Sequence, residues 1–136
     1  MRFLNRHTIT LILFYTTMAF FGQVPQDKIK AKIEVENIEG NVKITGTAEN
    51  LTDVMRSAAY RLSVIKNNNK SNNQSNNDQI GIFTLQPNEI QKLSTSQINL
   101  LEDDEVIVLL LFYDENKQII AKDRVVLGEE KKKKIQ

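Results

Sequence analysis

The sequence predicts an all-β protein, an immunoglobulin-like antiparallel β-sandwich of about seven strands. Apolar and polar residues alternate in one short segment after another between residues 28 and 127. Residues that favour turns interrupt this alternation at intervals of about ten residues, as in sandwich proteins. No segment shows a helical period. Two sheets packed face to face would bury the alternating apolar residues, and a small β-barrel is the alternative architecture.

The first expected hairpin shows the pattern most clearly. Residues 28–37 place Ile29, Ala31 and Ile33 on one face and charged residues on the other, which is typical of a half-buried strand. A turn at residues 38–41 follows, in which Gly40 and Asn41 are the residues expected to adopt positive φ. The complete set of expected strands is 28–37, 42–49, 56–66, 79–85, 90–100, 106–113 and 118–127.

Two segments of the chain have unusual compositions. Residues 67–79 contain seven Asn and no apolar residue, which predicts a long, mobile polar loop. Residues 106–113 are apolar without interruption, which predicts a central strand covered on both faces.

The N-terminal sequence is typical of an exported protein. Arg2 and Arg6 precede a short apolar run that ends near the small residues Ala19 and Gly22. A basic start, an apolar middle and a small-residue exit are the features of a secretory signal peptide, and the run is too short for a comfortable membrane span. We expect residues 1–22 to be the signal peptide, cleaved after Ala19 or after Gly22. Residues 23–128 would then form the β-sandwich domain, and residues 129–136 a charged tail that includes Lys131–Lys134.

The composition disfavours several kinds of chemistry. The chain has no Cys, and His7, its only His, lies in the expected signal peptide. Nucleophilic triads and zinc sites of the usual types therefore lack their residues, and we expect a protein that is not an enzyme and has no cofactor or metal. Residues 23–130 carry 12 basic and 17 acidic side chains, a net of −5, which disfavours nucleic acid as a partner. Calcium binding at Glu102–Glu105 and hydrolysis by paired carboxylates remain open alternatives.

One stretch resembles a known family. The Ser- and Asn-rich residues 71–78 lead into Gln-x-Gly-x-Phe-x-Leu-x-Pro at residues 79–87, after a strand that contains Tyr60–Val64 and before Ile107–Tyr113 and Asp123–Leu127. In this respect the chain is similar to the CsgH-like family of the curli system, over most of residues 28–127. The resemblance implies an immunoglobulin-like β-sandwich and a periplasmic inhibitor that prevents premature fibre formation by an amyloid subunit.

The same stretch supplies candidate partner-binding residues. Amyloid grows when an exposed strand edge templates the next chain, so an inhibitor could dock by strand addition or through an outer sheet face. We selected Gln79, Ile80, Gly81 and Phe83, although Phe83 also has the pattern of a core residue. The expected partner is a curli-type amyloid subunit. We expect this protein to be periplasmic, with secretion as the alternative, and not to be inserted stably in a membrane after signal cleavage. A structural or adhesive accessory module of an extracellular fibre is the alternative function.

Overall fold

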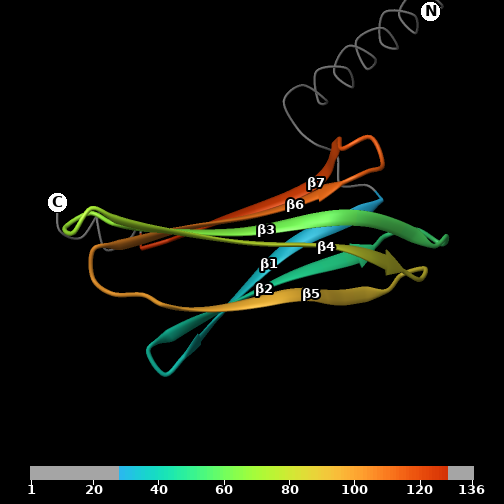
Figure 1. The fold of residues 1–136 in the computed structure, drawn as a ribbon. Coiled ribbons are helices and arrows are strands. Elements are labelled where there is room, and N and C mark those ends of the chain that lie inside the picture. The colour runs from blue at the N-terminus through green and yellow to red at the C-terminus, as the bar shows by residue number, and fades with distance from the viewer. Residues whose placement is uncertain (1–27, 129–136) are drawn as a thin grey trace, which may run out of the picture.

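The computed structural model describes residues 28–128, which form two antiparallel sheets packed face to face (Figure 1). The expected signal peptide, residues 1–22, and the expected tail, residues 129–136, lie outside the described residues. The strands are β1 (Ile29–Ile38), β2 (Asn41–Asn50), β3 (Arg56–Asn68), β4 (Asn73–Leu85), β5 (Ile90–Asn99), β6 (Asp104–Tyr113) and β7 (Ile119–Leu127). The predicted β-sandwich of seven antiparallel strands is confirmed.

The strand order is that of an immunoglobulin-like sandwich. One sheet has the order β1-β2-β5 and the other the order β4-β3-β6-β7. Every neighbouring pair is antiparallel, and β3 pairs with β4 on one side and β6 on the other. The edges of the two sheets are therefore β1 and β5 in one and β4 and β7 in the other.

The core lies between the sheets and is built from the alternating residues that the sequence pattern indicated. On β3 the inward residues include Leu62 and Val64, and on β6 they include Leu110 and Phe112. Phe112 packs against Phe83 with their ring centroids 4.9 Å apart. The buried apolar residues are Ile29, Ala31, Ile33, Val42, Ile44, Ala48, Ala58, Leu62, Val64, Phe83, Leu85, Val106, Val108, Leu110, Phe112 and Ala121. Burial of this set supplies the main stabilisation of a fold that has no disulfide.

The β1–β2 turn corrects one detail of the expectation. Ile38 pairs with Asn41, so the turn consists of Glu39 and Gly40, with φ of 47° and 86°. Two successive residues with positive φ are typical of a type I′ turn, whose twist matches that of the strands. Glu39 rather than Asn41 therefore adopts the unusual conformation, and Asn41 begins β2.

The Asn-rich segment was predicted wrongly as a long loop. Residues 67–79 belong largely to the ends of β3 and β4, which pair without interruption from Arg56↔Leu85 to Asn68↔Asn73. Only four residues, 69–72, connect the two strands, and Asn72 adopts a φ of 60°. The composition favours turns, but cross-strand hydrogen bonds to β3 override this local preference.

The expectation that β6 is covered on both faces also needs correction. Its inward side chains are buried, but the alternating set Ile107, Leu109, Leu111 and Tyr113 is only partly buried. This set lies on the outer face, which we define as the face of the β4-β3-β6-β7 sheet turned away from β1-β2-β5. Within residues 28–128 there is no third layer over that face. The same part of the chain contains no helix long and apolar enough to cross a membrane.

Candidate binding surface on the edge of the four-stranded sheet

The four candidate residues lie in the second half of β4 but point in two directions. Ile80 is 73% exposed on the outer face, and Gln79 and Gly81 are partly buried on the inner side. Phe83 is 3% exposed and belongs to the core, so its selection as a surface residue was wrong. The alternation of a β-strand separates Phe83 from Ile80, because residues an odd number apart point to opposite faces.

Gln79 and Gly81 help to seal the side of the sandwich between β4 and β5. The Nε2 of Gln79 donates a hydrogen bond of 3.4 Å to the carbonyl of Thr95, while its Oε1 is buried without a partner among the described residues. Tyr60 lies over Gly81, where an added Cβ would stand 2.7 Å from the ring, and its hydroxyl donates to the carbonyl of Leu93 at 3.4 Å. Glycine therefore fits at position 81 because the Tyr60 ring occupies the space of a side chain.

The outer face carries an exposed apolar area beside these residues. Ile82 is 83% exposed and Ile80 is 73% exposed, next to Ala59 and Arg61 of β3 in the antiparallel register. A groove in this area is lined by Ala59, Tyr60, Arg61, Ile80, Gly81, Ile82, Tyr113, Asp114 and Lys117. Two neighbouring isoleucines exposed to this degree on one strand are unusual and favour a role in binding.

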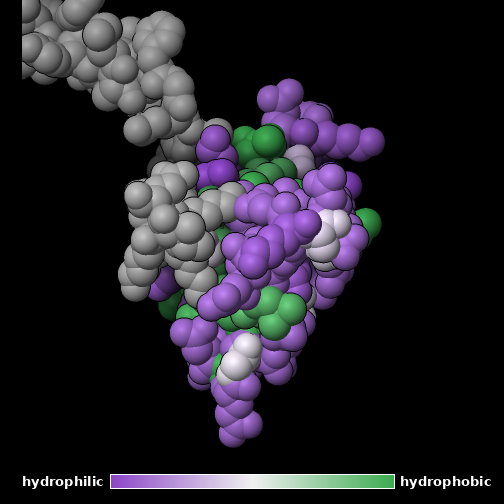
Figure 2. All heavy atoms as spheres, turned by 90° about the vertical axis from the view of Figure 1, so that its left-hand side faces the viewer, coloured by the Kyte–Doolittle hydropathy of each residue, from purple (hydrophilic) through white to green (hydrophobic). Residues whose placement is uncertain are grey.

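The first half of β4 forms a different surface, which we call the amide edge, residues Asn73–Asp78. All six residues are exposed, and their sequence is Asn-Gln-Ser-Asn-Asn-Asp. Within residues 28–128, β3 is the only strand that pairs with them. Figure 2 looks onto the end of the sandwich where the β3–β4 turn lies, and this end is predominantly hydrophilic. The amide edge thus presents polar side chains and one unpaired strand edge within the described part of the chain.

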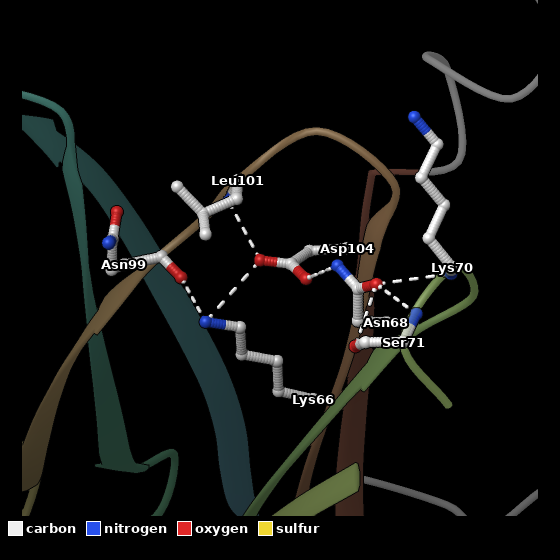
Figure 3. Close-up of polar contacts among 7 residues, drawn as sticks. All are labelled: Lys66, Asn68, Lys70, Ser71, Asn99, Leu101 and Asp104. Carbon is white, nitrogen blue, oxygen red and sulfur yellow. Dashed lines mark hydrogen bonds and ion pairs between the residues drawn. The ribbon is translucent and has the colours of Figure 1, made fainter. Parts of the chain in front are cut away.

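A buried carboxylate anchors the turn beside the amide edge (Figure 3). Asp104 is 3% exposed; its Oδ1 accepts a hydrogen bond of 2.7 Å from the Nδ2 of Asn68, and its Oδ2 accepts one of 2.7 Å from the backbone N–H of Leu101. The Nζ of Lys66 lies 3.3 Å from Oδ2. The oxygen of Asn68 in turn accepts hydrogen bonds from the backbone of Lys70 and Ser71. The network joins the β3–β4 turn to the β5–β6 turn.

These contacts determine the ionisation of Asp104. Burial alone would raise its pKa, but the hydrogen bonds from Asn68 and Leu101 and the nearby Lys66 ammonium outweigh it and hold the pKa below its usual value of 3.8. Asp104 is therefore a structural anion and not part of a solvated acidic turn. No group of three or more His, Cys, Asp or Glu residues in the described segment is arranged to hold a metal ion, which disfavours the calcium reading of Glu102–Glu105.

The opposite side of the sandwich, between β1 and β7, is closed by a side chain. Asp123 lies on β7, and its Oδ2 accepts a hydrogen bond of 2.8 Å from the backbone N–H of Ile33 on β1. This bond satisfies a backbone group on an edge strand that would otherwise be available to another chain. We call this side the closed side.

Sequence reasoning missed the polar residues that hold the turns in place. Asn50 is 1% exposed; its Nδ2 donates to the carbonyls of Val54 and Gln86 at 2.7 and 3.0 Å, and its Oδ1 accepts from Thr52. Asn50 and Asp104 lie in ordinary turn compositions, and Asn68 is one of the seven Asn residues of residues 67–79. A local signal in the sequence was present for Asn50 alone, which stands two residues before Thr52. An Asn side chain commonly accepts a hydrogen bond from the backbone N–H two residues further on.

Comparison with known proteins finds likeness in structure and not in sequence. No family model matches, and no curated protein matches. The Escherichia coli curli protein CsgC has a TM-score of 0.57 at 12% identity, over 71% of this chain and 97% of CsgC. The solution structure of CsgH from R. palustris has a TM-score of 0.53 at 17% identity, over 69% of this chain and 89% of CsgH.

A third similar structure belongs to a much larger protein. A Bacteroides uniformis β-glucuronidase has a TM-score of 0.52 at 8% identity, over 73% of this chain but only 14% of the enzyme. All three identities are low, so these comparisons establish a fold shared with two curli proteins and with a small part of a glycoside hydrolase.

Proposed function

We propose that this protein is an exported, periplasmic binding module that holds a curli-type amyloid subunit and delays fibre formation, as the resemblance to the CsgH-like family implies. The observation that carries the proposal is the fold shared with CsgC and CsgH, which extends over 97% and 89% of those chains. The likeness to the β-glucuronidase covers a small part of a large enzyme and supports no activity for this chain.

The side-chain inventory supports binding rather than catalysis. After residue 22 the chain has neither His nor Cys, which removes the usual nucleophile and base pairs. The carboxyl of Asp104, whose pKa is lowered, is buried and engaged in holding two turns together. A screen of the purified protein against glycans is the direct check, and hydrolysis above background would favour the carboxylate hydrolase instead.

A fibre-growth assay tests the proposal. The purified protein is mixed with a curli-type amyloid subunit, and dye fluorescence is followed at low molar ratios. We expect a long delay at substoichiometric dose, because growing ends are few and capping them requires few molecules. An unrelated β-sandwich protein is the control and should leave growth unchanged. Unchanged growth at equimolar dose of this protein would overturn the proposal.

A second function is favoured by the exposed isoleucines of the outer face. Ile80 and Ile82 could attach the domain to an assembled fibre, as expected for a structural or adhesive accessory module. Sedimentation with preformed fibres separates the two functions. An accessory module would sediment with fibres and leave their growth rate unchanged.

A further inference from the structure

The amide edge is exposed both along its unpaired edge and on its two faces. β4 stands at the end of the order β4-β3-β6-β7, and its 13 residues form one of the two longest strands. The outward residues Gln74 and Asn76 are exposed, and so are the inward residues Asn73, Ser75 and Asn77. An added strand would therefore find the backbone and both rows of side chains accessible.

The protective features that proteins place on edge strands are missing from this segment. Such edges usually carry Lys, Pro or a β-bulge, or point a charge inward. Asn73–Asp78 contains no Lys or Pro, and its register with β3 shows no shift. The one charge, Asp78, points outward and lies 3.9 Å from the Nε of Arg61. By contrast, β5 pairs with β2 through a register shift at Gly46/Thr47, and β1 has Asp123 against it.

The side chains of this edge define the chemistry of a suitable strand. Each Asn or Gln amide both donates and accepts hydrogen bonds, so a second row of amides in register could pair with the first as a ladder. Charged side chains would lose hydration there without a partner, and large apolar ones would find no apolar surface among Asn73–Asp78. Amide-rich strands are therefore the best match.

The edge is also held in its extended shape before any partner binds. Thirteen residue pairs fix β4 against β3, and the turn is tied to buried Asp104 through Asn68. A rigid edge loses little conformational entropy when a strand is added, which favours affinity.

From this combination we propose that the amide edge, Asn73–Asp78, binds an extended, Asn- and Gln-rich segment of the amyloid subunit as an additional strand of the four-stranded sheet. The inference rests on the proposed function and specifies its contact surface and the chemistry of the bound segment. The bound strand would continue the sheet beyond β4 and bury the subunit's own edge against this domain.

The test uses nuclear magnetic resonance with the purified protein and a synthetic peptide in which Asn and Gln alternate with Ser. We expect backbone amide shifts concentrated at residues 73–78. A peptide in which Thr replaces every Asn and Gln should bind at least about tenfold more weakly. Shifts confined to Ile80 and Ile82 would overturn the inference, as would equal binding of both peptides.

Two charge-matched variants separate the edge from the neighbouring apolar area. Gln74→Lys/Asn76→Lys places two ammonium groups on the amide edge, and Ile80→Lys/Ile82→Lys places two on the same strand and face farther along. Both pairs replace exposed residues, so their urea midpoints should stay close to that of the wild type. We expect the first variant to lose peptide binding by at least about tenfold and the second to retain it. The reverse pattern would overturn the inference.

The same variants in the fibre-growth assay distinguish this inference from the proposed function. Delay by the wild type that persists in Gln74→Lys/Asn76→Lys would leave the function standing and overturn the edge as its site. Peptide binding at residues 73–78 without any delay of fibre growth would support the edge and overturn the function. A concentration-dependent dimer, lost in Gln74→Lys/Asn76→Lys, would show that the edge pairs with a second copy of this chain and would overturn the inference.

Discussion

The two sides of the sandwich treat their strand edges differently. On the closed side, the carboxylate of Asp123 on β7 accepts a hydrogen bond from Ile33 on β1, and the two edge strands lie against each other. On the other side, which we call the open side, hydrogen bonds from Gln79 of β4 and Tyr60 of β3 reach β5, and the amide edge continues past them as an exposed strand. The edge strands of the closed side are therefore protected, and the amide edge is not.

This difference separates edge exposure from fold stability. The core is continuous beneath both sides, since Leu62 and Val64 of β3 and Leu110 of β6 are fully or almost fully buried. The exposed edge belongs to a segment that contributes no apolar side chain to that core. Its order depends instead on strand pairing and on the Asp104 network, so polar substitutions should affect the two sides in distinct ways.

The largest effect is expected at the anchor of the open side. In Asp104→Asn, an NH2 group replaces one carboxylate oxygen and faces a hydrogen-bond donor. The Asn68 amide cannot rotate to offer its oxygen instead, because that oxygen already accepts hydrogen bonds from Lys70 and Ser71. We expect a loss of about 2–3 kcal/mol in the free energy of unfolding, measured in urea, with faster amide exchange at residues 68–73. Asp103→Asn is the matched control. Asp103 is only partly buried and its ion-pair partner Lys70 is largely exposed, so we expect a change below about 1 kcal/mol. Equal losses in the two variants would contradict the assignment of Asp104 as the anchor.

The next effect concerns the closed side. Asp123→Ala leaves the N–H of Ile33 without its acceptor, and we expect a loss of about 1–2 kcal/mol. It also exposes the edge of β1, so light scattering should show aggregation at concentrations where the wild type stays monodisperse. Asp123→Asn keeps an acceptor oxygen, so its free energy of unfolding should lie between those of Asp123→Ala and the wild type. An Asp123→Ala protein as stable and as soluble as the wild type would show that this carboxylate neither stabilises the closed side nor protects its edge.

A smaller effect is expected at Gly81, which lies under the Tyr60 ring on the open side. In Gly81→Ala, the new methyl group must displace the Tyr60 ring, which weakens its hydrogen bond to Leu93 and its packing near Phe83, whose centroid is 6.2 Å away. We expect a loss of about 1 kcal/mol. In a Tyr60→Ala background the same substitution should be neutral or stabilising, because Ala is better than Gly in a strand without a clash. A loss of the same size in both backgrounds would contradict the role of the ring.

Periodicity predicted most of the fold because burial imposes it. All seven strands were located, and residues such as Ile33, Leu62 and Leu110 point inward as their alternation indicated. The pattern failed where no side chain is buried. Residues 73–78 carry no apolar residue, so nothing in the sequence marked them as a strand, and their order comes from β3.

Only part of the candidate surface was predicted, because periodicity reports burial and gives no signal for exposed polar strands or long-range polar contacts. Ile80 lies on the exterior, Phe83 is buried, as its alternative pattern of a core residue indicated, and the amide edge was taken for a loop. Asp104 was counted with its acidic neighbours, because its burial depends on Asn68 and Lys66, which lie 36 and 38 positions earlier in the chain. Such long-range polar contacts leave no periodic signal in a single sequence.

The smallest expected effect is the pH dependence of the open-side anchor. The pKa of Asp104 in the folded protein lies below its usual value of 3.8, so the ionised carboxyl stabilises the fold. This contribution is complete above the pKa of the unfolded chain, and it is lost as the pH falls through the lower folded value. The gap in unfolding free energy between the wild type and Asp104→Asn should therefore stay constant at neutral pH and narrow below about pH 3.8. An Asp104→Asn gap that is unchanged down to about pH 2.5 would show that the network does not depend on the charge of Asp104.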